Sequence, residues 1–246
     1  MQTSVEVASP QGALYGGKTK PYPSLSKATS IRVCVLSPGK PSDQISCRLI
    51  TLDLEDEPEF EALSYEWRVL EHRQGDISLG GSPYSIGGNL HYALTELRSQ
   101  DTERRLWIDA LCINQDDIIE RAHQVGLMSR IYGQAQNVLA WLGPPSENSD
   151  IAMSLLDFCA QHAHKIYLPM ESPDEQNFDK SQPAALLDIL ERTYWKRVWI
   201  IQEIMLARSI VLHCGSWTVP CAYFRSNHLS SNHFHPTPWK SNTACS

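Results

Sequence analysis

Near the end of the chain, two indoles and a carboxylate recur at four-residue intervals, at Trp195, Trp199 and Glu203. If residues 193–206 form a helix, these side chains share one face, because residues four apart lie one above the other. The positions three and four residues on either side of Glu203 hold no cation. An acid among apolar neighbours costs free energy unless a distant group pairs with it, and such acids are enriched at functional sites. We therefore predict that Glu203 is a catalytic carboxylate and that Trp199 belongs to the wall of a binding site.

A purely structural interpretation of Glu203 competes with the catalytic one. In this interpretation the carboxylate pairs with Arg197, Arg208 or an arginine far away in the sequence, and the tryptophans belong to the core. The two interpretations differ in what lies beside the carboxylate. A catalytic Glu203 lines a cleft, whereas a structural one is sealed against an arginine.

A second group of polar side chains follows an apolar run at residues 106–113. We predict that this run is a core strand, and ligands of parallel α/β sheets usually bind where such a strand turns into the next helix. Asp109, inside the run, is expected to accept hydrogen bonds from loop amides. Asn114 and Gln115 either brace the turn or hydrogen-bond the polar edge of a ligand.

Residues 60–67 are apolar first and then polar and aromatic, which predicts a central strand that ends at an exposed rim. The carboxyl ends of parallel strands meet at one edge of a sheet, so this rim can adjoin the turn after residue 113. The candidate binding residues are therefore Ser64, Tyr65, Trp67, Asp109, Asn114, Gln115 and Trp199.

A rival chemistry would use Cys112 as a nucleophile, with His123 or His213 as its base and Asp109 to orient that base. Cys112 lies inside an apolar run and not at an electropositive helix start, which disfavours a reactive thiolate. The chain contains no G-x-S-x-G, G-x-x-x-x-G-K-[ST] or G-x-G-x-x-G sequence, so serine hydrolase, P-loop and Rossmann readings lose their usual support. The seven cysteines form no C-x-x-C pair and the histidines lack ligands at motif spacing, so we predict no metal site.

The elements that must position these residues follow from hydrophobic periodicity. Residues 31–36 and 47–54 alternate between apolar and polar, which predicts an antiparallel N-terminal strand pair at the edge of the sheet. Further strands are expected at 60–67, 77–79, 84–86, 106–113, 138–142 and 210–215, and helices at 90–97, 118–132, 151–162 and 184–191. Recurring strand, helix and strand predict an α/β fold with a mainly parallel central sheet flanked by helices.

Composition and charge limit the class of protein. An apolar fraction of 42% in 246 residues is ordinary for a soluble chain with a packed core, and a net charge of −7 argues against nucleic acid as a partner. No stretch approaches the roughly 20 apolar residues of a membrane helix, and the start of the chain lacks a signal-peptide pattern, so we expect a cytoplasmic location and no membrane span. We divide the chain into a flexible leader at 1–30, a domain at 31–220 and a disordered or truncated tail at 221–246.

Five ordered blocks of the sequence resemble the heterokaryon incompatibility (HET) domain of filamentous fungi. They are Glu61–Trp67, then Leu106–Gln115 with Glu120-Arg121 and Gln124-Val125, then Ile131-Tyr132 with Ala135, then Trp141–Gly143, and finally Arg197–Glu203. Together they cover roughly residues 31–215 in the order of the family. One departure is Arg68, which stands where the family usually has a glycine after Ser-Tyr-x-Trp, so a tight positive-φ turn is disfavoured there.

The resemblance implies a role in non-self recognition, where such domains trigger regulated cell death through protein partners when alleles are incompatible. The family is also distantly similar to Toll/interleukin-1 receptor (TIR) domains, flavodoxin-like sheets that either assemble by homotypic contact or cleave NAD with a glutamate. That comparison places the glutamate at Glu203. When nicotinamide leaves, the ribose becomes oxocarbenium-like, so a nearby carboxylate can stabilise the charge and an aromatic wall can hold the ring.

We therefore predict a HET effector that promotes cell death, with NAD as a substrate and no firmly bound cofactor. Two alternatives stay open. The chain could be a non-enzymatic module that signals by homotypic assembly, or an inert truncated product. Release of nicotinamide from NAD separates the enzyme from both alternatives.

Overall fold

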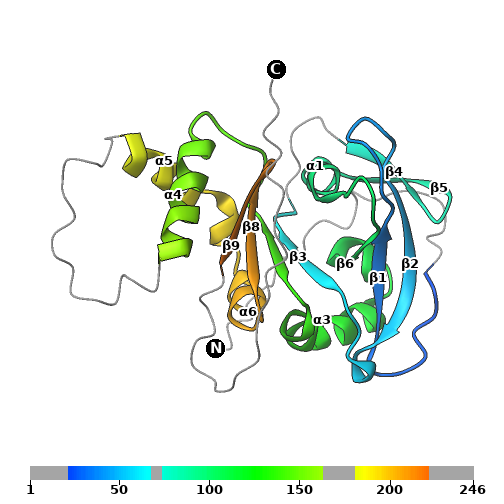
Figure 1. The fold of residues 1–246 in the computed structure, drawn as a ribbon. Coiled ribbons are helices and arrows are strands. Elements are labelled where there is room, and N and C mark those ends of the chain that lie inside the picture. The colour runs from blue at the N-terminus through cyan, green and yellow to red at the C-terminus, as the bar shows by residue number, and fades with distance from the viewer. Residues whose placement is uncertain (1–21, 68–73, 163–180, 222–246) are drawn as a thin grey trace, which may run out of the picture.

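The computed structural model describes residues 22–67, 74–162 and 181–221 (Figure 1). The strands are β1 (Ser30–Leu36), β2 (Ser46–Asp53), β3 (Glu61–Tyr65), β4 (Gln74–Leu79), β5 (Ser82–Gly87), β6 (Arg104–Trp107), β7 (Val138–Trp141), β8 (Ile210–Cys214) and β9 (Trp217–Cys221). The helices are α1 (Gly88–Leu97), α2 (Asp109–Cys112), α3 (Ile118–Gln134), α4 (Ser149–His162), α5 (Ser181–Leu190) and α6 (Ile200–Met205), with 3-10 turns η1 (Leu54–Asp56) and η4 (Thr193–Lys196). Across this part of the chain, one nine-stranded sheet runs in the order β5-β4-β2-β1-β6-β3-β7-β8-β9. None of the described helices is long and apolar enough to cross a membrane.

The sheet is mixed. Its central strands β6, β3, β7 and β8 run parallel, but four of the eight neighbouring pairs are antiparallel. Tight hairpins make two of these antiparallel pairs, at Gly80-Gly81 and at Gly215, where positive φ angles suit glycine. The fold is therefore α/β, and the prediction of a mainly parallel sheet is not confirmed.

The N-terminal strands β1 and β2 pair antiparallel along their whole length, from Ser30 opposite Asp53 to Leu36 opposite Cys47. This confirms the predicted pair. They do not form an edge, because the β4–β5 hairpin adds to β2 and β6 adds to β1. The consequence is that β1 is buried along its whole length, with apolar side chains on both faces.

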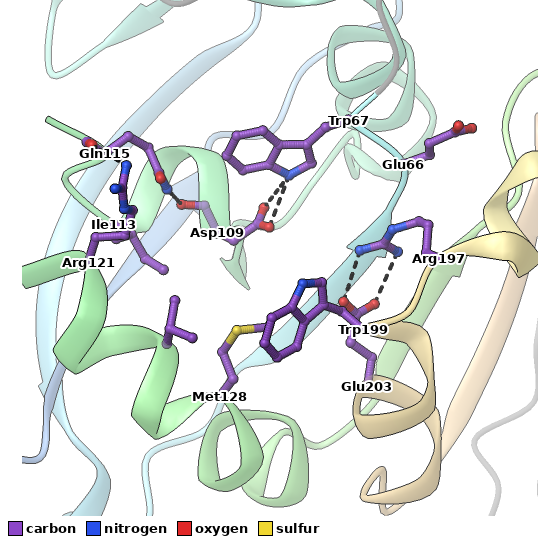
Figure 2. Close-up of a pocket in the computed structure, with 11 residues that line it drawn as sticks. Glu66, Trp67, Asp109, Ile113, Gln115, Arg121, Met128, Arg197, Trp199 and Glu203 are labelled. Atoms are coloured by element: carbon purple, nitrogen blue, oxygen red, sulfur yellow. Dashed lines mark hydrogen bonds and ion pairs between the residues drawn. The ribbon is translucent and has the colours of Figure 1, made fainter. Parts of the chain in front are cut away.

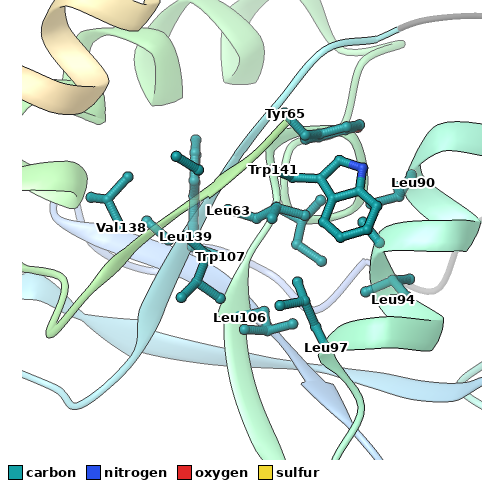
Figure 3. Close-up of a cluster of buried hydrophobic side chains, with 14 of the residues drawn as sticks. Leu63, Tyr65, Leu90, Leu94, Leu97, Leu106, Trp107, Val138, Leu139 and Trp141 are labelled. Carbon is teal, nitrogen blue, oxygen red and sulfur yellow. The ribbon is translucent and has the colours of Figure 1, made fainter. Parts of the chain in front are cut away.

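The apolar stripe predicted for the first helix is confirmed in α1. Leu90, Leu94 and Leu97 pack against strand residues that include Leu106 and Trp141 (Figure 3). Asn89 lies in the first turn of α1, whose N-cap residue is Gly87. Its side chain accepts the Trp141 indole N–H at 2.9 Å and donates to the Glu66 carbonyl at 2.8 Å, which ties the start of α1 to the ends of β7 and β3.

The run at residues 106–113 is not one strand. β6 ends at Trp107, and the chain then forms the helical turn α2. The Asp109 carboxylate accepts the Ala110 N–H at 2.7 Å, and the Cys112 N–H donates to the Ile108 carbonyl at 2.7 Å. These local hydrogen bonds compete with strand pairing, so Asp109 lies just past the end of β6 and not within a strand.

Residues 193–206 also depart from prediction, because they do not form one helix. The turn η4 ends at Lys196. The backbone of the next residue, Arg197, is extended (φ −75°, ψ 132°), and α6 begins at Ile200. Trp195 therefore turns away and donates its indole N–H to the Ile189 carbonyl at 2.9 Å. The prediction that Trp195 shares a face with Trp199 and Glu203 is wrong.

Candidate functional site

A cavity of about 360 Å³ opens where β3 and β6 end (Figure 2). Its wall comes from the end of β3, from α2 and the turn after it, from α3, and from the chain around the start of α6. The lining residues are Glu66, Trp67, Asp109, Ile113, Gln115, Arg121, Val125, Met128, Arg197, Trp199 and Glu203. Segments far apart in sequence thus meet at the carboxyl ends of two adjacent parallel strands, where α/β folds commonly bind ligands.

Glu203 is buried, with 1% of its surface exposed, although it belongs to the cavity wall. Its carboxylate forms a two-point ion pair with Arg197, with nitrogen to oxygen distances of 2.9 and 3.1 Å (Figure 2). It also accepts a hydrogen bond from the Ser64 hydroxyl, and the Ser64 and Tyr194 hydroxyls lie 2.7 Å apart. The arginine partner of the structural interpretation and the cleft of the catalytic interpretation are therefore both present.

Asp109 presents a second carboxylate to the same cavity. The Trp67 indole N–H donates to both of its oxygens, at 3.0 and 2.9 Å. Among the residues that the structure describes, no lysine, arginine or histidine forms an ion pair with Asp109. Burial, and then the charge of Glu203, raise the pKa of Asp109 to about 7.

The mouth of the cavity carries an indole and a guanidinium. Trp199 is 48% exposed and lies beside Met128 in Figure 2. Arg121 is exposed and donates to the Gln115 carbonyl at 3.1 Å, and it has no carboxylate partner within the described ranges. Arg121 was not among the predicted site residues. Its position directly after Glu120 in a family block was the available signal.

Five of the eight predicted site residues belong to the cavity wall, and three do not. Glu203, Trp199, Trp67, Asp109 and Gln115 line the cavity. Ser64 lies behind Glu203, and the Tyr65 side chain packs near Trp141 on the α1 side of the sheet, because neighbouring strand residues point to opposite faces (Figure 3). Asn114 stays out of the wall and braces the turn, since its side-chain oxygen accepts the Asp116 N–H at 3.3 Å.

The rival cysteine chemistry finds no support in these contacts. The Cys112 thiol is buried, accepts the Ile108 N–H at 3.3 Å, and has its pKa raised to about 12, chiefly by burial. The His123 ring contacts the Ala28 carbonyl, and His213 contacts Thr218 on β9. Neither histidine reaches the thiol. The described residues also contain no cluster of three or more metal-ligating side chains.

A buried ion pair holds the turn that carries the site. Arg32 on β1, 2% exposed, binds both carboxylate oxygens of Glu120 on α3, at 2.5 and 3.0 Å. The same guanidinium donates to the Cys112 carbonyl at 3.2 Å, and Glu120 accepts the Asn114 N–H at 2.8 Å. One pair therefore fixes both ends of the turn from α2 to α3, and with it Asp109, Gln115 and Arg121.

The residues that line the cavity all lie within the part of the chain that matches a known protein family. A family model described as "Heterokaryon incompatibility protein (HET)" matches residues 60–203. The chain belongs to the HET family. It is also similar to "Heterokaryon incompatibility protein 6, OR allele" of Neurospora crassa, with 29% identity over 228 residues. The match covers 76% of this chain and 33% of that relative, so the chain spans about a third of its length. No solved structure matches the chain.

Three of the five HET blocks contribute residues to the cavity wall: the block at residues 61–67, the block at 106–115 with its extension to 125, and the block at 197–203. Arg68, the departure from the family pattern, lies outside the described residues. So do most of the proposed leader and tail, although Tyr22 donates its hydroxyl to the Ile113 carbonyl at 3.0 Å. The distant similarity of HET domains to TIR domains stays a prediction.

Proposed function

We propose that this HET domain is an effector of heterokaryon incompatibility that promotes cell death by cleaving the bond between nicotinamide and ribose in NAD. The observation that carries the proposal is the shared cavity of Glu203 and Asp109. At its mouth lie the Trp199 indole and the Arg121 guanidinium, which has no carboxylate partner among the described residues. The name of the Neurospora relative supports the role in incompatibility. The parallel strands β6-β3-β7-β8 follow the chain order 2-1-3-4 of flavodoxin-like sheets, which supports the comparison with TIR domains.

The chemistry needs a negative charge at the ribose. As the bond to nicotinamide breaks, its electron pair leaves with the ring nitrogen and positive charge develops on the ribose. A carboxylate already fixed by Arg197 and Ser64 needs no reorganisation to meet that charge, so Glu203 is suited to stabilise it. A water then adds to the ribose, which gives ADP-ribose, nicotinamide and one proton.

Arg121 is proposed to bind the pyrophosphate of the dinucleotide. Arg121→Ala is expected to raise KM for NAD about tenfold or more, because a hydrogen bond to a charged group contributes about 1.5–3 kcal/mol. The matched control is Arg130→Ala on the same helix, whose partner is Glu55 and which does not line the cavity. Equal KM values for the two variants would remove Arg121 from the site.

Trp199 is proposed to stack on a ring of the dinucleotide. Trp199→Ala is expected to raise KM about tenfold, since stacking of a base on an aromatic side chain contributes about 1–3 kcal/mol. Trp217→Ala is the control, because Trp217 is similarly exposed at 43% but lies away from this cavity on β9. Steady-state kinetics with both proteins measure the difference, and an unchanged KM for Trp199→Ala would contradict the assignment.

A second candidate function, signalling by homotypic assembly, has one observation in its favour. Val198, just before α6, and Ile201 and Met205, within it, are 81%, 65% and 68% exposed. Apolar side chains exposed together are a common feature of protein interfaces. Assembly and catalysis are therefore both compatible with this face, and an experiment in cells must separate them.

Expression of the chain in Neurospora crassa hyphae, with cellular NAD and viability followed over time, separates the functions. The proposal expects NAD to fall before viability does, and expects Glu203→Gln to prevent both. Death that leaves NAD unchanged and persists in Glu203→Gln would favour assembly. Hyphae that keep both NAD and viability would indicate an inert product.

A further inference from the structure

We propose that Asp109 is the base of this site: its carboxylate takes a proton from the water that attacks the ribose, while Glu203 stabilises the positive charge of the ribose. This inference rests on the proposed function, because it assigns a role within the same cavity. It goes beyond that function by giving the two carboxylates different tasks. It also changes the role first expected for Asp109, which was to organise a loop or bind ligand.

The two carboxylates line one cavity from different elements and have different partners. Glu203, on α6, faces a guanidinium and a hydroxyl. The donors that the described residues give to the Asp109 carboxylate, in the first turn of α2, are neutral N–H groups, those of the Trp67 indole and of its neighbour Ala110. A cation beside a carboxylate favours its charged form, whereas desolvation of a carboxylate without a paired cation favours its neutral form. Paired acids in such unequal surroundings are the pattern of acid and base assignments.

Several charged or titratable side chains surround Asp109, and they come from different elements of the fold. Glu203 raises its pKa, and Arg197 lowers it. Tyr132 on α3 and Cys112 on α2 also interact with its charge, and burial raises the pKa of both, so neither carries charge at neutral pH. Glu66 and Arg121 lie on the same cavity wall. Burial is the largest influence, so Asp109 exchanges its proton near neutral pH.

The proton balance of the step is closed. The bond from the ribose carbon to the nicotinamide nitrogen breaks, and neutral nicotinamide leaves with the electron pair. Water oxygen bonds to the same carbon and gives its proton to the Asp109 carboxylate, which later releases it to solvent. No oxidant, reductant or metal is needed. The base must start without a proton, so the rate rises with pH until Asp109 is fully ionised.

The first test measures the protonation of Asp109 in the absence of substrate. In the full-length chain, the ¹⁵N–¹H signal of the Trp67 indole is expected to shift with a midpoint near pH 7, and Asp109→Asn is expected to abolish this shift. Asp116→Asn, an exposed acid on the same turn outside the cavity, is the matched control and should keep the shift. A Trp67 signal that stays constant from pH 5.5 to 8.5 would overturn the inference, whether or not NAD is cleaved.

Stability gives a second readout without substrate. The pKa of Asp109 is higher in the folded chain than in the unfolded chain, so the folded chain binds the proton more tightly. The contribution of Asp109 to the free energy of unfolding therefore falls as pH rises from about 4 to about 7. Asp109→Asn should remove this fall, and Asp116→Asn should keep it.

The second test measures nicotinamide release against pH. We expect kcat to rise about tenfold per pH unit below the midpoint found for Trp67, and Asp109→Asn to lower the plateau by at least about 100-fold. If Asp109→Asn does not fold, Trp67→Phe serves instead. Loss of the indole N–H donor should move the midpoint of the rise in kcat to higher pH. Turnover with no rise in this range would overturn the base role and leave the proposed function standing. No turnover in a protein whose Trp67 signal titrates would overturn the proposed function, and with it the base role.

Discussion

Glu120→Ala is expected to lower the free energy of unfolding by about 3–5 kcal/mol, because it leaves the Arg32 guanidinium buried without a counter-charge. The side chains of Arg32 and Glu120 are only 3% and 16% exposed. The same substitution removes the acceptor of the Asn114 N–H, so the turn after α2 loses a second contact. Such a loss is a large part of the 5–15 kcal/mol that is typical of a folded domain. Urea denaturation followed by tryptophan fluorescence measures it.

The matched control for Glu120 is Glu103→Ala. Glu103 makes the same two-point contact with Arg48, at 2.5 and 2.9 Å, but both side chains are about half exposed. Water solvates both charges after the substitution, so little change in stability is expected. Similar losses for the two substitutions would show that burial does not set the strength of the Arg32–Glu120 pair.

Glu203→Gln is expected to lower the rate of nicotinamide release by at least about 100-fold, as is typical when a fixed electrostatic group is removed from a reaction centre. Glutamine keeps the size of the side chain and can still bond with Ser64 and Arg197 through its oxygen. Alanine is a poorer test, because it would leave Arg197 without its partner and lower stability by several kcal/mol. Unfolding caused by alanine therefore cannot distinguish a catalytic from a structural Glu203.

The control for Glu203 is Glu96→Gln, at an exposed position on α1 outside the cavity. Thermal denaturation of both variants should show a folded protein, so that a loss of rate can be assigned to the site. Full activity of a folded Glu203→Gln would exclude the catalytic role and leave the ion pair with Arg197 as the function of this residue.

The periodicity of apolar residues predicted the helices and strands in which burial follows a regular pattern along the sequence. Alternation located β1 and β2, and the spacing of Leu90, Leu94 and Leu97 located the buried face of α1. A continuous apolar run located β7, which is buried at every position. In each case the side chains that report burial are neighbours in the sequence, so a local pattern carries the information.

The parts that could not be predicted depend on local hydrogen bonds that compete with strand pairing, or on contacts between distant segments. The helical turn at Asp109 interrupts an apolar run that continues in sequence, and short hydrogen bonds with backbone groups stabilise it. β9 was missed because its five residues pair with β8 without a strong alternation of their own. Arg121 joins the site only because the Arg32–Glu120 pair fixes the turn before α3.

The candidate site could be predicted only in part, because some of its contacts join segments that are distant in sequence. Glu203, Trp199, Trp67, Asp109 and Gln115 were chosen from residue type and position, and all five line the cavity. Arg197 was among the predicted partners of Glu203. Ser64 and Trp67 could not be predicted as partners of Glu203 and Asp109, because they reach these carboxylates from β3 and from the residues just after it, which are far away in sequence.

Nicotinamide release from NAD by the purified wild-type chain, followed by liquid chromatography over a range of protein concentrations, tests the central claim most directly. The cavity and its two carboxylates predict equal amounts of nicotinamide and ADP-ribose, formed at a rate that Glu203→Gln lowers by at least about 100-fold. Absence of both products at the highest concentration, and also when the chain is clustered on a support, would contradict the account.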